Sequence, residues 1–182
     1  MPRPNRFLNP QELRMFYVIL FTLPGVPFLY YGDEIEMIYH EKLPSKECGY
    51  GRTGTRTPMV WDNSKNKGFS DADEKDLFLP IDKTTSVEDK KNDKNSIYYL
   101  IKNLIDLRKN TEDLLGNEIE FITSDNRMLI YRRNGLLVVI NPSSEQKEVE
   151  VDETNIVFVD GKATINDNKL LICSQSSVIL GK

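Results

Sequence analysis

The sequence contains few residues that could bind a transition metal or act as a strong nucleophile. Its 182 residues include one histidine, His40, and two cysteines, Cys48 and Cys173. A single histidine argues against histidine-based zinc sites and against a Ser-His-Asp triad. The two cysteines lie far apart and show no metal-ligand spacing, so we interpret them as reduced thiols. No phosphate loop or dinucleotide fingerprint is present, and we predict neither a metal nor a cofactor.

The sequence also lacks an excess of positive charge and a long apolar run. Its net charge of -4 excludes an overall basic footprint for nucleic acid. The longest apolar stretch, residues 16–31, is interrupted by a threonine, two prolines and a glycine, which is not typical of a membrane span. No charged start followed by an apolar core indicates a signal peptide. We therefore expect a cytoplasmic protein without nucleic-acid or membrane partners.

The residues that are present fit a folded protein, with 39% hydrophobic and 29% charged residues. Asn9 as N-cap, Pro10 at the first helical position and Glu12 three residues after Asn9 predict a helix over residues 9–23. The nearly continuous apolar run over residues 26–31 predicts a strand buried on both faces, as in a parallel sheet covered by helices. Such an αβ unit belongs to a larger α/β domain.

Residues 38–95 form a long polar stretch, and loops of this length are usually functional or mobile. Its part over residues 83–94 is mostly charged, and we interpret it as solvated surface. A second helix is predicted over residues 96–110, with one apolar stripe. The stripe consists of Ile97, Leu100, Ile101, Leu104 and Ile105.

Beyond Gly116 the pattern changes to short β-branched runs between turn signals, of which Asn134-Gly135 is the strongest hairpin signal. Seven strands are predicted, over residues 118–123, 128–133, 136–141, 148–151, 156–159, 169–173 and 177–180. Seven short strands over so few residues predict a small antiparallel sandwich. We therefore predict a domain division between residues 1–116 and 117–182.

Two segments resemble a known family. Residues 23–35, Leu-Pro-Gly-Val-Pro-Phe-Leu-Tyr-Tyr-Gly-Asp-Glu-Ile, resemble the L-P-G-x-P-x-x-Y-Y-G-x-E-I segment at the last barrel strand of glycoside hydrolase family 13, the α-amylase family. Residues 56–62, Arg-Thr-Pro-Met-Val-Trp-Asp, with Gly-Phe-Ser at 68–70, resemble the R-T-P-M-Q-W-x…G-F-S stretch of trehalose synthases, oligo-1,6-glucosidases and α-glucosidases. Val60 stands where these relatives usually carry glutamine.

The resemblance implies an α+β fragment of a larger enzyme. Residues 1–116 would be the last αβ part of a (β/α)8 barrel, with its last strand, a long loop and its last helix. Residues 117–182 would be the small antiparallel β-sandwich after the barrel. The family cleaves or transfers α-glucosides with retention, which requires two carboxyl groups about 5 Å apart at the C-terminal ends of the barrel strands.

The resemblance also implies that the catalytic carboxylates are missing. In the family they come from strands four, five and seven, and this chain resembles only the part of the family after strand seven. Met1-Pro2-Arg3 resembles the x-P-R after the family's N-H-D motif, so we expect the chain to begin one residue after the third catalytic aspartate. Asp33 and Glu34 are neighbours in an extended segment and point to opposite sides, so they cannot flank one bond. We predict no catalytic residue and no activity of this chain alone.

Four residues are predicted to contact an α-glucoside or oligosaccharide. Arg56 presents a rigid donor fork that suits hydroxyls, although a loop-stabilising ion pair is the alternative. Trp61 could stack on a sugar or anchor the packing of its turn. Tyr30 and Tyr31 end the predicted strand, and one of them could face the barrel mouth while the other belongs to the core; we select Tyr31. Arg3 would lie close to the site if it matches the x-P-R arginine.

Two alternatives stay open. The β domain could be a stand-alone carbohydrate-binding or assembly module. A single αβ unit cannot bury its own apolar faces, so we expect such a chain to self-associate through the exposed remnant of the barrel. An inactive or regulatory relative of the family is the other alternative.

Overall fold

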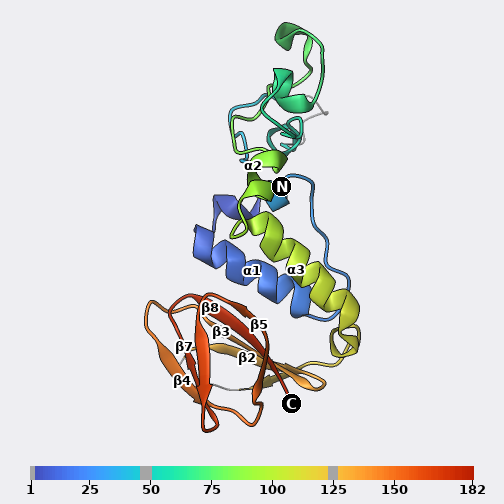
Figure 1. The fold of residues 1–182 in the computed structure, drawn as a ribbon. Helices are drawn as coiled ribbons and strands as arrows, with labels where there is room; N and C mark the ends of the chain where they lie inside the picture. Colours follow the sequence, from blue (N-terminus) through green and yellow to red (C-terminus); the bar gives the residue numbers. More distant parts are fainter. Residues whose placement is uncertain (1–2, 46–50, 123–126) are drawn as a thin grey trace. The chain divides into compact units, whose positions relative to one another are not determined.

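The computed structural model describes residues 3–45, 51–122 and 127–182 (Figure 1). Cys48 lies outside the described residues. The chain folds into two compact units, of which the first contains Met1–Asn9 and Phe28–Lys102, and the second Pro10–Pro27 and Asn103–Lys182. Each unit thus combines two separate stretches of chain. The division into domains at residue 116 stays a prediction.

The first unit is built mainly from irregular chain and short helices. Its 3-10 helices are η1 Pro4–Arg6, η2 Asp33–Ile35, η3 Thr53–Thr55, η4 Lys65–Gly68 and η5 Glu74–Asp76. A small core of Ile35, Met37, Met59 and Val60 is packed against Val87. The wholly buried Asp82 accepts backbone hydrogen bonds from Ile38 and Thr84. The long polar stretch is therefore folded around a core and a buried carboxylate.

A short helix, α2 Val87–Asn92, lies in the stretch that the sequence indicated to be solvated surface. A capping box starts it, in which the Ser86 hydroxyl accepts from the Asp89 N–H and the Asp89 carboxylate accepts from the Ser86 N–H. Ser86 is fully buried. The N-terminus of α2 is therefore part of the packed unit.

The prediction of a strand over residues 26–31 is wrong, because the structure contains no strand in this segment. A strand requires a neighbour to share its backbone hydrogen bonds, and none of the described strands, which begin at Glu120, pairs with it. Its apolar side chains are also exposed, with Phe28 at 86%. The expected burial on both faces does not occur within the described chain.

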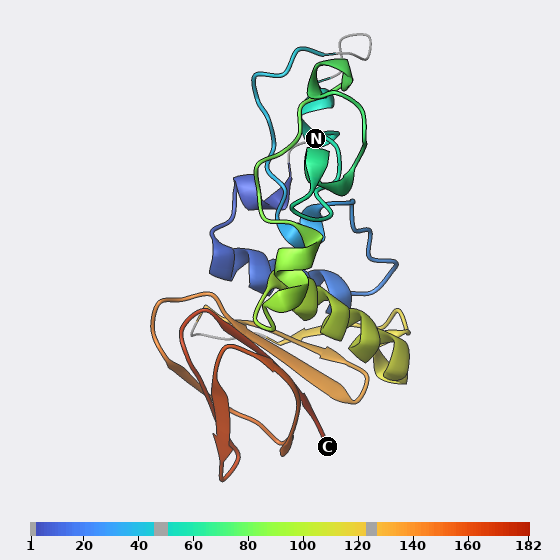
Figure 2. The same cartoon turned by 45° about the horizontal axis from the view of Figure 1, so that its top comes forward.

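Both predicted long helices are confirmed. They are α1 Pro10–Thr22 and α3 Ile97–Asn110, and α3 continues from the first unit into the second at Asn103. Leu13, Tyr17 and Phe21 of the expected apolar face of α1 are buried. A 3-10 helix, η6 Glu112–Leu114, comes after α3. Within the second unit, α1 and the C-terminal half of α3 lie side by side (Figures 1 and 2).

The seven predicted strands are present, together with an eighth that the sequence did not indicate. They are β1 Glu120–Ile122, β2 Leu129–Arg133, β3 Leu136–Asn141, β4 Lys147–Glu150, β5 Asn155–Asp160, β6 Ala163–Asn166, β7 Lys169–Ile172 and β8 Ser176–Gly181. They form a five-stranded sheet in the order β1-β2-β3-β8-β5 and a three-stranded sheet in the order β4-β7-β6. All pairings among these strands are antiparallel, and β2 and β3 join at Asn134-Gly135 as expected.

The five-stranded sheet is buried on both faces at its centre. Leu137 and Val139 of β3 share one hydrophobic cluster with Leu170 and Ile172 of the other sheet. Because successive side chains of a strand point to opposite faces, Val138 of β3 faces away from that cluster, and it too is fully buried. On this second face α1 contacts β8 (Figure 2).

A buried arginine joins the helices of the second unit to its sheet. Arg133, at the end of β2, is fully buried and donates hydrogen bonds to four backbone carbonyls. Their residues are Thr22, Leu114, Gly116 and Glu118. These carbonyls belong to the end of α1 and to the chain between α3 and β1. One guanidinium therefore ties three parts of the unit together.

Two further contacts stabilise the C-terminal end of α1. Arg108 of α3 donates to the carbonyls of Phe21, Leu23 and Gly25, which satisfies acceptors that the helix end leaves free. The hydroxyls of Thr22 and Tyr131 share a buried hydrogen bond. Burial raises the pKa of the Tyr131 hydroxyl to about 12, so this phenol stays neutral at physiological pH.

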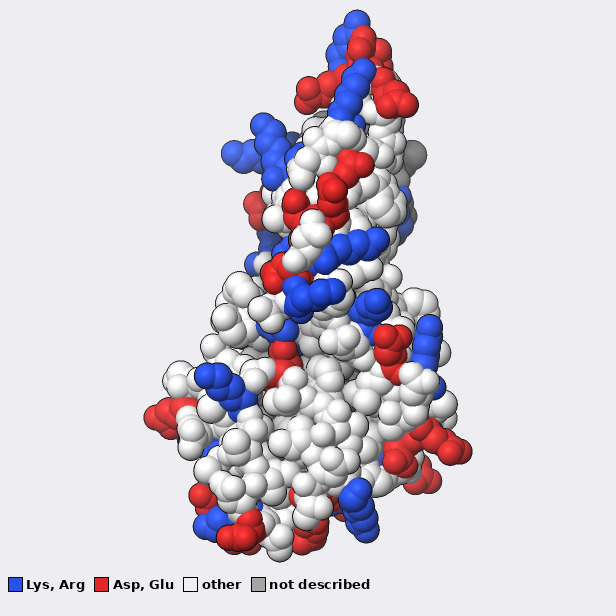
Figure 3. Space-filling view, in the orientation of Figure 1, with Lys and Arg blue, Asp and Glu red and all other residues white. Residues whose placement is uncertain are grey.

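Charges of both signs are interspersed on the face in Figure 3, where no extended area of one sign is visible on the described residues. Among the described residues, no helix is both long enough and apolar enough to cross a membrane.

We predict that Arg133→Met lowers the free energy of unfolding by about 3–5 kcal/mol, because it removes one donor group and leaves several buried carbonyls unsatisfied. Lys162→Met, at an exposed position of the same unit, is the control and should change stability by less than about 0.5 kcal/mol. Urea unfolding followed by circular dichroism measures both. A loss no larger than that of the control would show that the arginine is not needed.

Candidate active-site pocket

The guanidinium of Arg3 organises the candidate site in the first unit. Arg3 is 2% exposed and donates to the carbonyl of Tyr31 at 2.8 Å, to Oδ1 of Asp33 at 2.7 Å and to the carbonyl of Thr55 at 2.9 Å. It thereby connects the start of the chain, the turn after the apolar run and helix η3. Arg3 therefore lies next to Tyr31, another of the residues predicted to contact a sugar.

Gly32 permits this close approach. Its φ of +84° lies in the left-handed region that favours glycine. A Cβ at this position would clash with Sδ of Met37 and would lie 3.1 Å from Nη2 of Arg3. Asn5 adds a second tie, since its side-chain amide donates to the carbonyls of Glu36 and Met37. The turn and the N-terminal segment therefore fit together only with a glycine here.

A pocket of about 520 Å³ opens beside this arginine, and we call it the Arg3 pocket. It is lined by Arg3, Pro4, Phe28, Leu29, Tyr30, Asp33, Arg52, Thr55 and Arg56. The guanidinium carbon of Arg3 lies 5.5 and 5.6 Å from the ring centroids of Tyr30 and Tyr31, within the range of cation–π attraction. Rings and guanidinium groups beside one another suit a ligand with apolar faces and polar edges.

A smaller space of about 260 Å³, which we call the apolar slot, shares Arg56 with the Arg3 pocket. Its lining is Tyr31, Arg56, Thr57, Pro58, Met59, Phe69, Leu77, Phe78 and Leu79. The Tyr31 hydroxyl donates to the carbonyl of Thr57 at 3.0 Å, which fixes the ring against the Arg-Thr-Pro-Met segment. Arg56 lines both spaces, so it is a residue that they share.

The structure brings together three of the four residues predicted to contact a sugar. Arg3 and Arg56 line the Arg3 pocket, and Tyr31 lines the slot beside it. Trp61 lines neither space, and its side chain is 51% exposed. Tyr30 and Arg52 also line the Arg3 pocket. The sequence indicates Tyr30 only as the alternative to Tyr31, and it supports Arg52 less than Arg56.

The described lining of the Arg3 pocket contains one carboxylate, that of Asp33, and Arg3 holds it. The next residue, Glu34, does not line the pocket, and its Oε2 is buried without a hydrogen-bond partner. Burial raises the pKa of the Glu34 carboxyl, and the neighbouring Asp33 adds to this effect. Retaining cleavage requires two carboxyl groups across one bond. This lining can bind a polar ligand but offers one carboxylate, already paired.

Among the described residues, no group of three or more His, Cys, Asp or Glu side chains could hold a metal ion.

Comparisons with known proteins agree with the sequence motifs. The family model for the α-amylase catalytic domain matches residues 4–117. Glucan 1,6-alpha-glucosidase of Streptococcus pneumoniae is 27% identical over 180 residues, which is 79% of this chain and 34% of that protein. The human amino acid transporter heavy chain SLC3A1 is 34% identical over 133 residues, covering 69% of this chain and 19% of that protein.

The fold agrees as well. The crystal structure of α-amylase from H. orenii superposes with a TM-score of 0.72 at 25% identity, and covers 96% of this chain and 36% of that one. The chain thus spans about a third of the length of the glucosidases that it matches.

We predict that Arg3→Met destabilises the first unit by about 3 kcal/mol or more, because it leaves Asp33 and two carbonyls without their donor. Arg6→Met, which removes an arginine whose ion pair with Glu41 is exposed, should cost less than about 1 kcal/mol. Trp61 is the sole tryptophan and lies in this unit, so its fluorescence during urea unfolding reports both variants. Equal costs would contradict a central role of Arg3.

Proposed function

The chain belongs to the α-amylase family, and on this premise we propose that it is the C-terminal part of a retaining α-glucosidase or glucanotransferase. In this proposal residues 1–116 are the end of a (β/α)8 barrel, and residues 117–182 form the β-sandwich after it. The catalytic carboxylates belong to barrel strands that this chain does not contain. Its own contribution is to bind the substrate.

The Arg3 pocket is the observation that carries this proposal. A glucose ring has hydroxyl edges and apolar C–H faces, and the pocket offers guanidinium donors beside tyrosine rings. The segment over residues 26–31 supports it too, because an apolar run without a partner strand is what a barrel strand becomes without its neighbours.

The proposed roles follow from the positions of the side chains. Arg56 donates to sugar hydroxyls at the border between the Arg3 pocket and the apolar slot. Tyr31 provides a wall beside it, and Arg3 acts indirectly by holding Asp33 and the turn in place. Trp61, exposed and outside both linings, contacts only a ligand that extends beyond them.

A chain without nucleophile and acid should not hydrolyse glucosides by itself. Binding groups orient a substrate, but they cannot supply the covalent step or protonate the leaving oxygen. The ion pair between Asp33 and Arg3 also argues against hydrolysis by this chain.

A second candidate function is a self-associating binding module, which the exposure of Phe28, Leu29 and Tyr30 favours. Consecutive exposed apolar residues in an unpaired segment are unusual on a monomer and tend to be covered by association. A second copy of the chain could cover them.

We predict that the chain binds isomaltose with a millimolar dissociation constant and that Arg56→Met weakens binding about tenfold, or about 1.4 kcal/mol. Isothermal titration measures both, with maltose and trehalose as further ligands. Arg127→Met, at an exposed position of the second unit, is the control and should bind like the parent chain.

The same preparation should release p-nitrophenol from p-nitrophenyl α-glucoside at no more than the uncatalysed rate. Turnover by a chain of verified mass would overturn the assignment of the catalytic groups to absent strands. Absence of any sugar binding would overturn the role proposed for Arg56.

We further predict that the chain self-associates and that Phe28→Ser shifts it toward the monomer, because this ring is the most exposed large apolar group of the segment. Light scattering after gel filtration gives the mass of each variant. Phe7→Ser removes another exposed ring outside the segment and should leave the mass unchanged. A monomeric parent chain at high concentration would contradict the second candidate.

A further inference from the structure

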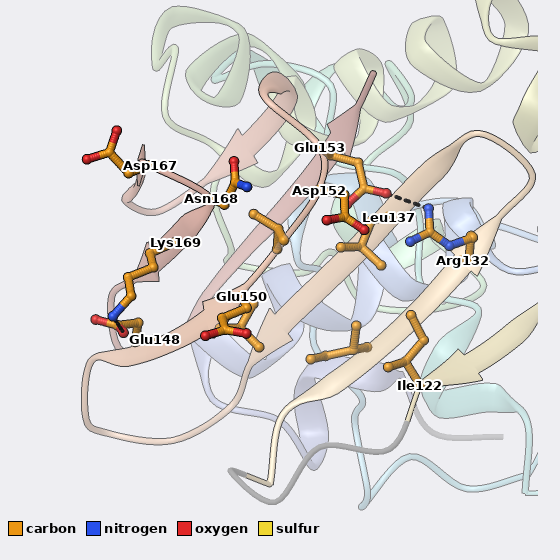
Figure 4. Close-up of a pocket in the computed structure, with 13 residues that line it drawn as sticks. Ile122, Arg132, Leu137, Glu148, Glu150, Asp152, Glu153, Asp167, Asn168 and Lys169 are labelled. Atoms are coloured by element: carbon orange, nitrogen blue, oxygen red, sulfur yellow. Dashed lines mark hydrogen bonds and ion pairs between the residues drawn. The ribbon is translucent and has the colours of Figure 1, made fainter.

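The second unit contains a cavity of about 780 Å³ between its two sheets, separate from the Arg3 pocket (Figure 4). It is lined by Ile122, Ile130, Arg132, Leu137, Glu148, Val149, Glu150, Val151, Asp152, Glu153, Asp167, Asn168 and Lys169. These residues come from β1, β2 and β3 of one sheet, from β4 and β7 of the other, and from two connections. None of them is selected from the sequence as a functional residue.

The floor of the cavity is apolar and belongs to the core of the unit. Ile130, Leu137 and Val151 are buried members of the hydrophobic cluster that the two sheets share. Val149 packs against the same cluster. A ligand that enters the cavity would therefore lay an apolar body against these side chains and remove apolar surface from water.

The rim carries an excess of negative charge. Among the described residues, five carboxylates and two basic side chains line the cavity, which gives this lining three more negative than positive charges. The two basic groups are already engaged, because Lys169 donates to Glu148 and Arg132 pairs with Glu153. The hydrogen bond to Glu148 raises the pKa of the Lys169 ammonium, as expected in a negative field.

Glu153 gives the site a feature that a solvated acidic rim does not have. Its residue is 1% exposed, and one carboxylate oxygen accepts from Arg132. The other oxygen, Oε2, is buried and has no hydrogen-bond partner among the residues that the structure describes. Figure 4 shows Glu153 and Asp152 converging with Arg132 above Leu137. A buried carboxylate oxygen without a donor is costly, and a donor from a ligand would offset that cost.

We propose that this cavity binds an organic cation, an alkylammonium group on an aliphatic body. Such a ligand only donates hydrogen bonds, which matches the carboxylates, and its methylene groups match the apolar floor. A neutral sugar fits less well, because the described lining residues carry excess negative charge and include no aromatic ring for a sugar to stack on. A bare metal ion fits less well too, since the described residues hold no suitable group of ligands. The proposal does not depend on the function of the Arg3 pocket.

The test compares 1,5-diaminopentane with 1,5-pentanediol, which has the same methylene chain without charge. Isothermal titration of the full chain at low salt should give at least tenfold tighter binding of the diamine, and added salt should weaken it. Equal binding of the diol, or displacement of the diamine by isomaltose, would overturn the proposal. A lysine side chain of a partner presents the same chemistry. Nα-acetyl-lysine amide is therefore titrated in parallel, and the tighter ligand indicates the source.

Variants locate the site. Glu153→Gln should weaken diamine binding more than tenfold. Asp152→Asn changes an exposed residue, so it should not disturb folding, and it should weaken diamine binding about threefold to fivefold. Glu145→Gln removes an exposed carboxylate outside the lining and should leave binding unchanged. If Asp152→Asn and Glu145→Gln bind the diamine equally, the cation is attracted by net charge alone and the cavity is not its site.

Discussion

A guanidinium that leaves water must find acceptors for its donor groups, and this constraint organises both units. In the first unit, the two terminal nitrogens of Arg3 donate to one carboxylate and two carbonyls, while its Nε has no acceptor among the described residues. In the second unit, Arg133 donates from all three of its nitrogens to four carbonyls. Each set of acceptors comes from segments that are distant in sequence. The guanidinium group is rigid and donates hydrogen bonds only in certain directions. These contacts therefore determine the positions of the segments as well as stabilising them.

The same constraint shapes the chemistry of the Arg3 pocket. The pairing of Arg3 with Asp33 occupies the one carboxylate of the described lining, while Arg56 lies at the border with the apolar slot. A pocket built in this way has donors and rings for a polar ligand but has no second carboxyl group for retaining cleavage. This arrangement supports the proposal that the chain contributes substrate-binding groups to a longer enzyme.

Much of the fold could be predicted from local pattern, and the exceptions have physical reasons. The two long helices and seven strands follow from apolar periodicity, which tertiary packing reinforced. Helix α2 was missed because it is polar almost throughout, although Ser86 and Asp89 offered a capping-box signal. Strand β6 has only four residues, which is too short for its alternation to be distinctive, although its Ala163 and Ile165 pack against the core. The run over residues 26–31 was misjudged because sequence reports a tendency to be buried, not the presence of a partner strand. Of the residues that line the Arg3 pocket or the apolar slot, Arg3, Tyr31 and Arg56 were selected from family motifs. Local pattern alone does not show that Tyr30 and Arg52 line the same pocket as Arg3.

The need to protect a sheet edge explains only some of the carboxylates that line the cavity in the second unit. β4 is an edge strand of the three-stranded sheet, and exposed charges such as Glu148 and Glu150 protect an edge from pairing with other chains. That explanation does not extend to Glu153, which lies outside the strand and is buried. A buried carboxylate with one oxygen unsatisfied costs stability and protects no edge. The proposed ligand binding explains both the burial of Glu153 and its unpaired acceptor Oε2, whereas a need for solubility explains neither.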